Sequence, residues 1–473
     1  MAMAASTAFA VTDGVNYEKK GTLECKNLWI ADRFHNNYEF ARLAFMEMGT
    51  KARTACIAKL GEANEDIKIL VGWSPTITEG ETSNDYAKIV VYNFLSGKEE
   101  KVLQCTYNGN PITGQLCANQ IGCDSYGHVW IAGYLSSTLK VTGEGKDAVV
   151  TGANAQRVYQ VNMETGECTI VNDFALGEDD WSATNAGRID YCSLVGDITL
   201  QEAPCVYMAA INGTNAPVYG FRAEQGAEGE DAWEPLMNDG SYGAMNFTET
   251  YPEGKASWSY APVAAVVKDE DFSGQLFYID GFTTAPTLYN TTGGIVDSFK
   301  NAPDLSPVDV GTNGVAEFNL NGEDFIVYSM NQYNKADEKT GVVCGARIAK
   351  LGEGQSFDGM EEMWVIPGEL GLGDTSDGGT RYHGLDAVHI TDENGMDGVF
   401  VLTFKCYNGL AVYQVAPEGY KTPGGVSDIT VDDNNNAPVQ YFNLNGVEVN
   451  ANNLTPGLYI TRQGDKGGKV VIK

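Results

Sequence analysis

The stretch Ile67-Lys-Ile-Leu-Val-Gly72-Trp73 is a short apolar segment that ends at a small residue followed by a bulky one. The same pattern returns down the chain at residues 128–134, 205–211, 276–282, 324–330 and 399–404. Its small residues lie between 48 and 77 positions apart. A motif that repeats at such irregular spacing indicates a repeated structural unit with loops of variable length, as in solenoids and propellers.

Short segments with period-two alternation flank the copies of this motif. Residues 53–58 precede the first copy, and residues 87–92 and 101–105 follow it, with turns rich in Gly, Asn and Asp nearby. Alternation and turns of this kind are typical of antiparallel strands, and four consecutive strands make one propeller blade. Six copies therefore predict six blades between about residues 52 and 415.

The last predicted blade stops at its third strand, residues 410–415. Residues 27–31 form an isolated strand near the N-terminus, and we expect this strand to complete the last blade and close the ring. Closure removes the open sheet edges that invite aggregation. Seven blades are the alternative, because residues 28–32 resemble residues 129–133 and residues 40–45 offer a partner strand.

The composition changes after Val415. Residues 416–438 are rich in Pro, Gly, Asp and Asn, which is typical of a linker, and three short strand patterns follow it. The sequence therefore predicts an all-β chain. We expect a β-propeller over residues 11–415, a linker over 416–438 and a small β-sandwich-like module over 439–473.

The first ten residues look like the end of a secretory signal peptide. Ala8 and Ala10 match the small-x-small cleavage pattern, so Val11 is expected to begin the mature chain. No run of 18 apolar residues occurs, and we expect no membrane span. The 63 acidic and 31 basic residues give a net charge of -32, which repels phosphate backbones and excludes nucleic acid as a partner.

The ten cysteines include no C-x-x-C pair and no Cys/His cluster with metal-ligand spacing. Cys192 and Cys205 are expected on adjacent strands of one hairpin, which makes them the candidate disulfide. Others, such as Cys56, lie in apolar strand patterns that are typical of buried free thiols.

Polar and aromatic residues recur where the predicted first strands begin and where the second strands end. In a propeller these loops converge on one face around the central channel. Aromatic rings stack on sugars, and Arg, Asn and His supply directional hydrogen bonds. The predicted ligand-binding residues are Arg53, Trp73, Asn119, Tyr134, Arg188, Tyr260, Phe282, Asn313, Tyr333, Arg381, His383 and Tyr407. The competing interpretation is that the aromatics pack between blades and the arginines pair with carboxylates.

The common catalytic motifs are absent from the sequence, including Gly-x-Ser-x-Gly, the phosphate loop and His-Glu-x-x-His. We therefore predict a binding or scaffold protein with a glycan or protein partner, and assign no catalytic residue and no cofactor. Acidic turns at residues 269–271 and 392–397 offer oxygen ligands, so a structural calcium ion remains an open alternative. Two other functions stay open: a polysaccharide-acting enzyme that uses His383, Arg381 and acidic rim residues, and a self-associating extracellular subunit.

The C-terminal strands carry the segments Tyr441-Phe-Asn-Leu-Asn-Gly446-Val, Pro456-Gly-Leu-Tyr-Ile460 and Lys469-Val-Val-Ile-Lys473. These segments resemble the short C-terminal modules of exported Bacteroidota proteins, which are similar to type IX secretion sorting domains. The resemblance implies a secreted or cell-surface protein, with the outer-membrane secretion machinery as a partner. The propeller region resembles secreted propeller-like domains of unknown function from the same bacteria, and this resemblance carries no site residues.

Overall fold

The computed structural model describes most strands of the chain and a part of its loops. The described residues are 19–32, 51–61, 66–80, 82–114, 116–133, 135–136, 140–142, 149–151, 155–175, 188–200, 205–212, 218–223, 226, 233–235, 244–245, 249, 251, 263–266, 276–281, 284–307, 314–330, 345–367, 372, 383–406, 409–423, 439–443, 448–451, 454–463 and 466–472. The chain divides into two units, Met1–Tyr420 and Lys421–Lys473. Residues Pro303–Leu305 form a 3-10 turn, η6, and the described residues include no helix that is long and apolar enough to cross a membrane.

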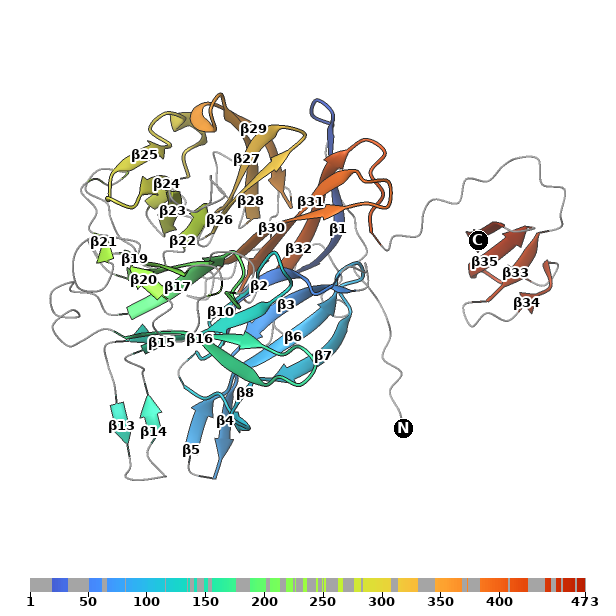
Figure 1. Ribbon diagram of the computed structural model, residues 1–473. Helices are drawn as coiled ribbons and strands as arrows, with labels where there is room; N and C mark the ends of the chain where they lie inside the picture. Colours follow the sequence, from blue (N-terminus) through green and yellow to red (C-terminus); the bar gives the residue numbers. More distant parts are fainter. Residues whose placement is uncertain are drawn as a thin grey trace. The chain divides into compact units, whose positions relative to one another are not determined.

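Six antiparallel sheets, which we call blades 1 to 6, make up the first unit, and their strands follow one another in chain order (Figure 1). Blade 1 contains β2 (Ala52–Lys59), β3 (Ile67–Trp73), β6 (Lys88–Asn93) and β7 (Glu99–Gln104). Blade 2 contains β10 (Gln120–Cys123), β11 (Val129–Ala132), β15 (Ala155–Val161) and β16 (Cys168–Ala175). Blade 3 contains β17 (Arg188–Val195), β18 (Cys205–Asn212), β19 (Val218–Ala223) and β20 (Trp233–Pro235), with β12 (Leu135–Ser136) added on β17 and β21 (Ala244–Met245) on β19.

The second half of the propeller repeats this arrangement. Blade 4 contains β22 (Val263–Val266), β23 (Leu276–Gly281), β24 (Thr284–Asn290) and β25 (Ile295–Ser298). Blade 5 contains β26 (Val315–Leu320), β27 (Glu323–Met330), β28 (Gly345–Gly352) and β29 (Ser356–Ile366). Blade 6 contains β30 (His383–Thr391), β31 (Asp397–Lys405), β32 (Gly409–Pro417) and, from the other end of the chain, β1 (Leu23–Asp32).

The N-terminal strand closes the ring, as the sequence predicts. β1 pairs antiparallel with β32, so that Trp29 lies opposite Val412. The first strands of consecutive blades also touch all the way round: β2 contacts β10, β10 contacts β17, β17 contacts β22, β22 contacts β26, β26 contacts β30, and β30 contacts β2. The described strands therefore form a six-bladed β-propeller. Residues 40–45, the partner strand that a seventh blade needs, lie outside the described residues.

The hydrophobic core lies between the blades. One cluster joins blades 6 and 1 through Trp29, Ile69 and Phe400, and four further clusters occupy the remaining seams. Trp29 is 1 % exposed and donates from Nε1 to the carbonyl oxygen of Phe94 at 2.7 Å. Its indole lies so close to Gly97 that a Cβ there would approach the ring within 2.9 Å. The N-terminal strand is thus fixed to blade 1 as well as to blade 6.

Four buried or partly buried aspartates join neighbouring blades at three of these seams or their edges. Asp124 of the turn in blade 2 accepts from the Ile198 amide, and Asp280 of blade 4 accepts from the Gly314 amide. Asp297 of blade 4 accepts from the Phe357 amide at 2.7 Å, and Asp386 of blade 6 accepts from the Ile57 amide at 2.8 Å. A part of the acidity of this chain therefore satisfies backbone donors between blades, because buried amides need acceptors.

Short hairpins occupy connections between the propeller strands. They are β4 (Thr76–Glu79) with β5 (Thr82–Asp85), β8 (Thr106–Tyr107) with β9 (Asn110–Pro111), and β13 (Lys140–Thr142) with β14 (Val149–Thr151). The second unit is a separate antiparallel sheet in the order β34 (Glu448–Val449), β33 (Gln440–Phe442), β35 (Gly457–Gln463) and β36 (Lys466–Ile472). Its described strands form one sheet.

Candidate functional site

Five of the twelve predicted ligand-binding residues belong to the described part of the chain. Arg53, Trp73 and Asn119 are described with their side chains, whereas Arg188 and His383 are placed only as the first residues of β17 and β30. The other seven lie outside the described residues: Tyr134, Tyr260, Phe282, Asn313, Tyr333, Arg381 and Tyr407.

The structure brings Arg53 and Asn119 together at the start of blades 1 and 2. The guanidinium Nη1 of Arg53 donates to the Asn119 side-chain oxygen at 3.4 Å, and both residues are buried. Trp73 is partly buried, and the ammonium group of Lys88 lies 5.3 Å from its ring centroid. Contacts within the protein therefore already occupy some of the hydrogen-bonding groups and the ring surface of these three side chains.

The predicted disulfide between Cys192 and Cys205 is wrong, because both residues are buried free thiols. They do lie on adjacent strands, β17 and β18. Cys192, however, pairs with Ala209, which stands four positions along β18 from Cys205. Four strand positions span roughly 13 Å, well beyond the Cα separation of about 4–7 Å that a disulfide bridges.

The centre of the propeller contains a cavity of about 180 Å³. Its walls come from β2, β10, β11, β17 and β30, and from Gly314 just before β26. The side chains that carry polar or reactive groups there are Thr54, Cys56, Gln120, Cys123, Trp130, Tyr191, Cys192, Ser193 and Asp386. A volume of this size holds several waters or one small ring, and is below the 300–1,000 Å³ or so of sites for drug-sized ligands.

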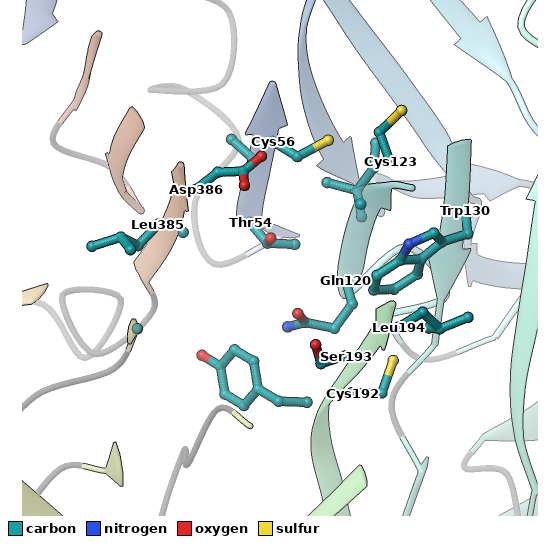
Figure 2. A pocket seen from close by; sticks show the side chains of 16 residues that line it. Thr54, Cys56, Gln120, Cys123, Trp130, Cys192, Ser193, Leu194, Leu385 and Asp386 are labelled. Carbon is teal, nitrogen blue, oxygen red and sulfur yellow. The ribbon is translucent and has the colours of Figure 1, made fainter. Parts of the chain in front are cut away.

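Two buried donors of this cavity wall have no acceptor among the described residues: Nε2 of Gln120 and Nε1 of Trp130. Gln120 is 6 % exposed and Trp130 is 5 % exposed. Figure 2 shows the Gln120 amide extending into the space between the strands, with the indole nitrogen of Trp130 on the ring edge that faces the cavity. More than nine in ten buried polar groups are paired, so two such donors at one cavity are a distinctive feature.

Gly122 allows Trp130 to take this position. The two residues are directly opposite in the β10–β11 pair. A Cβ on Gly122 would come within 2.4 Å of the indole ring and within 2.7 Å of its nitrogen. The missing side chain lets the indole lie against the inner strand β10, where Trp130 also lines the cavity.

Asp386 provides the carboxylate of the cavity. One oxygen accepts from the Ile57 amide at 2.8 Å, and the other accepts from the Ala387 amide at 2.9 Å. Burial raises the pKa of Asp386 to about 6, although these two hydrogen bonds oppose the rise. Figure 2 shows its carboxyl group facing Cys56 and Thr54 at one end of the cavity, while Gln120, Ser193 and Cys192 lie toward the other.

The thiols that line the cavity are protonated at neutral pH. Burial is the main cause that raises the pKa of Cys123 to about 12, and burial also raises the pKa of Cys56 and of Cys192. A thiol with a raised pKa is a poor nucleophile and a poor metal ligand, because both roles need the thiolate. Cys56, Cys123 and Cys192 therefore act as small apolar or weakly donating walls.

One group of side chains in the described ranges has the spacing of a metal site: Asp124, His128 and Asp197, whose ligand atoms lie within 4.8 Å of one another. Nδ1 of His128 lies 2.9 Å from Asp124 and 3.1 Å from Asp197. The carboxylates also accept from backbone amides, Asp124 from that of Ile198 and Asp197 from that of Thr199. The set is thus an internally hydrogen-bonded network that links blades 2 and 3.

Of the two acidic turns considered for calcium, residues 269–271 lie outside the described residues. In the other turn, Oδ1 of Asp392 accepts from the amides of Asn394 and Met396. Asp397 lies 2.7 Å from Nδ1 of His389. These contacts are typical of an Asp-initiated hairpin turn, and a structural calcium ion stays a prediction.

The described residues among those predicted lie at or next to the ends of strands, whereas Gln120, Trp130 and Asp386 line the cavity and were not predicted. Two signals in the sequence point to them. Gln120 and Asp386 are polar residues inside segments predicted as buried inner strands, and Gly122 faces Trp130 across a predicted hairpin. A glycine in a strand often marks close approach of another group.

No family model matches this chain, and no curated protein matches it. Among solved structures, a DUF4623 family protein from Bacteroides eggerthii is 12% identical, with a TM-score of 0.48, and the match covers 83% of this chain and 77% of that one. An α-L-arabinofuranosidase from Fusarium graminearum is 12% identical, with a TM-score of 0.39, over 78% of this chain and 93% of that one. AofleA from Arthrobotrys oligospora is 10% identical, with a TM-score of 0.38, over 89% of this chain and 90% of that one. At such values these similarities carry no information on ligand or activity.

Proposed function

We propose that this chain is a non-catalytic binding protein that recognises a glycan and holds one sugar unit of it in the central cavity. The observation that carries the proposal is the pair of buried donors, Gln120 Nε2 and Trp130 Nε1, which have no acceptor among the described residues. Leaving a buried donor unpaired costs about 1–3 kcal/mol. A ligand oxygen that accepts from either donor removes that cost, so the cavity favours an oxygen-rich occupant.

Sugar hydroxyls suit the full set of polar groups in the cavity. A hydroxyl both donates and accepts, so one hydroxyl can accept from Gln120 or Trp130 while another donates to Asp386. The walls also contain apolar and aromatic surface from Leu194 and Trp130 for the C–H faces of a ring.

The chemistry of the lining favours binding over hydrolysis. Glycoside hydrolysis by the usual route needs two carboxyl groups, about 5–10 Å apart, on either side of the bond that breaks. Asp386 is the single carboxyl group among the described lining residues. The polysaccharide-acting enzyme that uses His383 and Arg381 would need a second acid, and the described part of the cavity does not supply one.

An extracellular or cell-surface location belongs to the same proposal. Its support is the sequence of the first ten residues and of the C-terminal strands, which resemble an export signal and a sorting module. A glycan ligand is chemically consistent with that location. Delivery by the outer-membrane secretion machinery follows from the same resemblance.

A glycan array with the purified chain, followed by calorimetric titration of each glycan that binds, tests the proposal. Gln120→Leu removes the unpaired amide at similar volume, so glycan affinity should fall about tenfold, or roughly 1.4 kcal/mol. The free energy of unfolding should stay the same or rise by up to about 1 kcal/mol, because the variant removes an unsatisfied buried group. If Gln120 had a purely structural role, Gln120→Leu would lower the free energy of unfolding and leave glycan affinity unchanged.

Thr403→Val is the matched control. Thr403 is fully buried on β31, its hydroxyl has no partner among the described residues, and it does not line the cavity. Its substitution should leave glycan affinity unchanged. An array without any bound glycan, or a glycan whose affinity is the same in the natural protein and in Gln120→Leu, would overturn the proposal. A protein partner would be the alternative in the first case.

A further inference from the structure

We propose that the central cavity accepts an uncharged sugar unit and rejects an acidic one, and that Asp386 is the residue that determines this selectivity. The inference rests on the proposed function and adds to it the chemical class of the sugar. It concerns a residue of the inner strand β30 that was not among the predicted ligand-binding residues.

The charge of the cavity wall is the first argument. The described lining residues include one carboxyl group and no Lys, Arg or His side chain. Arg53, the nearest predicted rim cation along β2, is buried and donates to Asn119 instead. A ligand carboxylate would therefore enter next to a like charge, with no cation in the described wall to compensate it. Like charges at short range in a partly desolvated site oppose binding strongly.

The geometry of Asp386 is the second argument. Its two oxygens each accept one backbone amide, from Ile57 and Ala387. An ionised carboxylate offers about four acceptor positions, so about two remain for a ligand. Asp386 is thus fixed by the backbone and keeps acceptor capacity on the cavity side, which suits a hydroxyl donor. A ligand carboxylate at neutral pH has no hydrogen to donate.

The groups that face Asp386 keep its charge uncompensated over the physiological range. They are the thiols of Cys56 on β2 and Cys123 on β10, whose pKa values are raised in part by the Asp386 charge itself. Both thiols stay neutral between pH 5 and 8. Asp386, whose pKa is raised to about 6 by burial, changes from mostly neutral to mostly ionised across the same range. Rejection of acidic sugars should therefore strengthen as the pH rises through 6.

Matched pairs of sugars test this selectivity directly. The probes are the methyl glycosides of glucose, galactose and mannose and the three corresponding methyl uronides, titrated by calorimetry at pH 7.5 and pH 5. The uronides stay ionised throughout, since such carboxyl groups titrate near pH 3–4. We expect at least one neutral glycoside to bind at pH 7.5, and its uronide to bind at least tenfold more weakly. The preference should shrink severalfold at pH 5.

Asp386→Asn is the decisive variant, because Asn keeps an oxygen acceptor for the Ile57 amide and removes the charge. This variant should reduce the ratio of neutral-glycoside affinity to uronide affinity at pH 7.5 at least tenfold. The ratio should no longer change with pH. Asp358→Asn removes an equal charge from an exposed position on β29 and should leave the preference unchanged. Circular dichroism and thermal unfolding of both variants establish that they are folded.

The outcomes separate this inference from the proposed function. If the array detects a glycan but none of the six probes binds, or a uronide binds as tightly as its neutral partner, the selectivity is wrong and the binding function stands. The same holds if Asp386→Asn and Asp358→Asn behave alike. If the array also detects no glycan, the proposed function fails with it.

Discussion

The propeller and the C-terminal unit use the same kind of strand but bury it to different degrees. In the propeller, eight of the nine residues of β32 are buried. In the C-terminal sheet, no strand residue with described burial is buried, and Ile460 is 38% exposed. Each blade has a neighbour on both faces, whereas a unit of this length has too little chain to cover one sheet. Alternation therefore identifies a strand, and the number of neighbouring sheets decides how much stability that strand supplies.

Among substitutions that probe this comparison, the loss of Trp29 on β1 should lower the stability of the propeller the most. Trp29→Ala removes a fully buried indole and its hydrogen bond to Phe94, and we expect a loss of about 3–5 kcal/mol in the free energy of unfolding. Guanidinium denaturation followed by circular dichroism measures it. A loss below about 1 kcal/mol would show that blade 6 does not depend on β1.

Removal of an aspartate that joins two blades should have the next largest effect. Asp297→Ala leaves the buried Phe357 amide and the Ser356 hydroxyl without their acceptor, and we expect a loss of about 3 kcal/mol. Asp358→Ala, at an exposed position two residues further along β29, is the control and should cost less than about 0.5 kcal/mol. Equal losses in the two variants would contradict a role for Asp297 between blades 4 and 5.

The third prediction concerns the pH dependence of propeller stability that arises from Asp386. Its pKa is raised in the folded protein, so its contribution to stability is complete below about pH 4 and is lost as the pH rises through 6. The free energy of unfolding of Asp386→Asn, measured relative to that of the natural protein, should therefore rise by about 2 kcal/mol when the pH is raised from 4 to 8. Chemical denaturation at both pH values measures this difference. A difference that stays constant with pH would be inconsistent with the raised pKa.

The smallest effect is expected in the C-terminal sheet. Ile460→Ser changes an already exposed side chain, so the unfolding midpoint of the propeller should stay within about 1 °C of the natural value. Differential scanning calorimetry measures that midpoint. A substantial shift would mean that the two units stabilise each other.

Most of the fold could be predicted from the sequence because it depends on local patterns. Alternating apolar residues and Asp/Asn/Gly turns predict second strands such as Ile67–Trp73, and the missing fourth strand of blade 6 predicts the role of Leu23–Asp32. The pairing of Cys192 with Ala209 could not be predicted, because register depends on the exact length of the β17–β18 connection.

The candidate site could be predicted only in part. A strand pattern shows two alternating faces but does not say which positions of an inner strand border the central cavity. Gln120 and Asp386 therefore gave no sign in the sequence that they share a cavity, since the ring brings together residues more than 250 positions apart. Trp130 reaches the same cavity from a second strand because Gly122 leaves room for it.

The pairing of β1 with β32 has a consequence for how the chain is made and delivered. During synthesis β1 leaves the ribosome before the other strands of the described propeller, and its partner β32 emerges after almost all of them. Until then β1 exposes a row of unpaired backbone groups, a state that favours association with other chains. A chain that emerges with its N-terminus first cannot finish the ring until residues 409–417 have emerged as well.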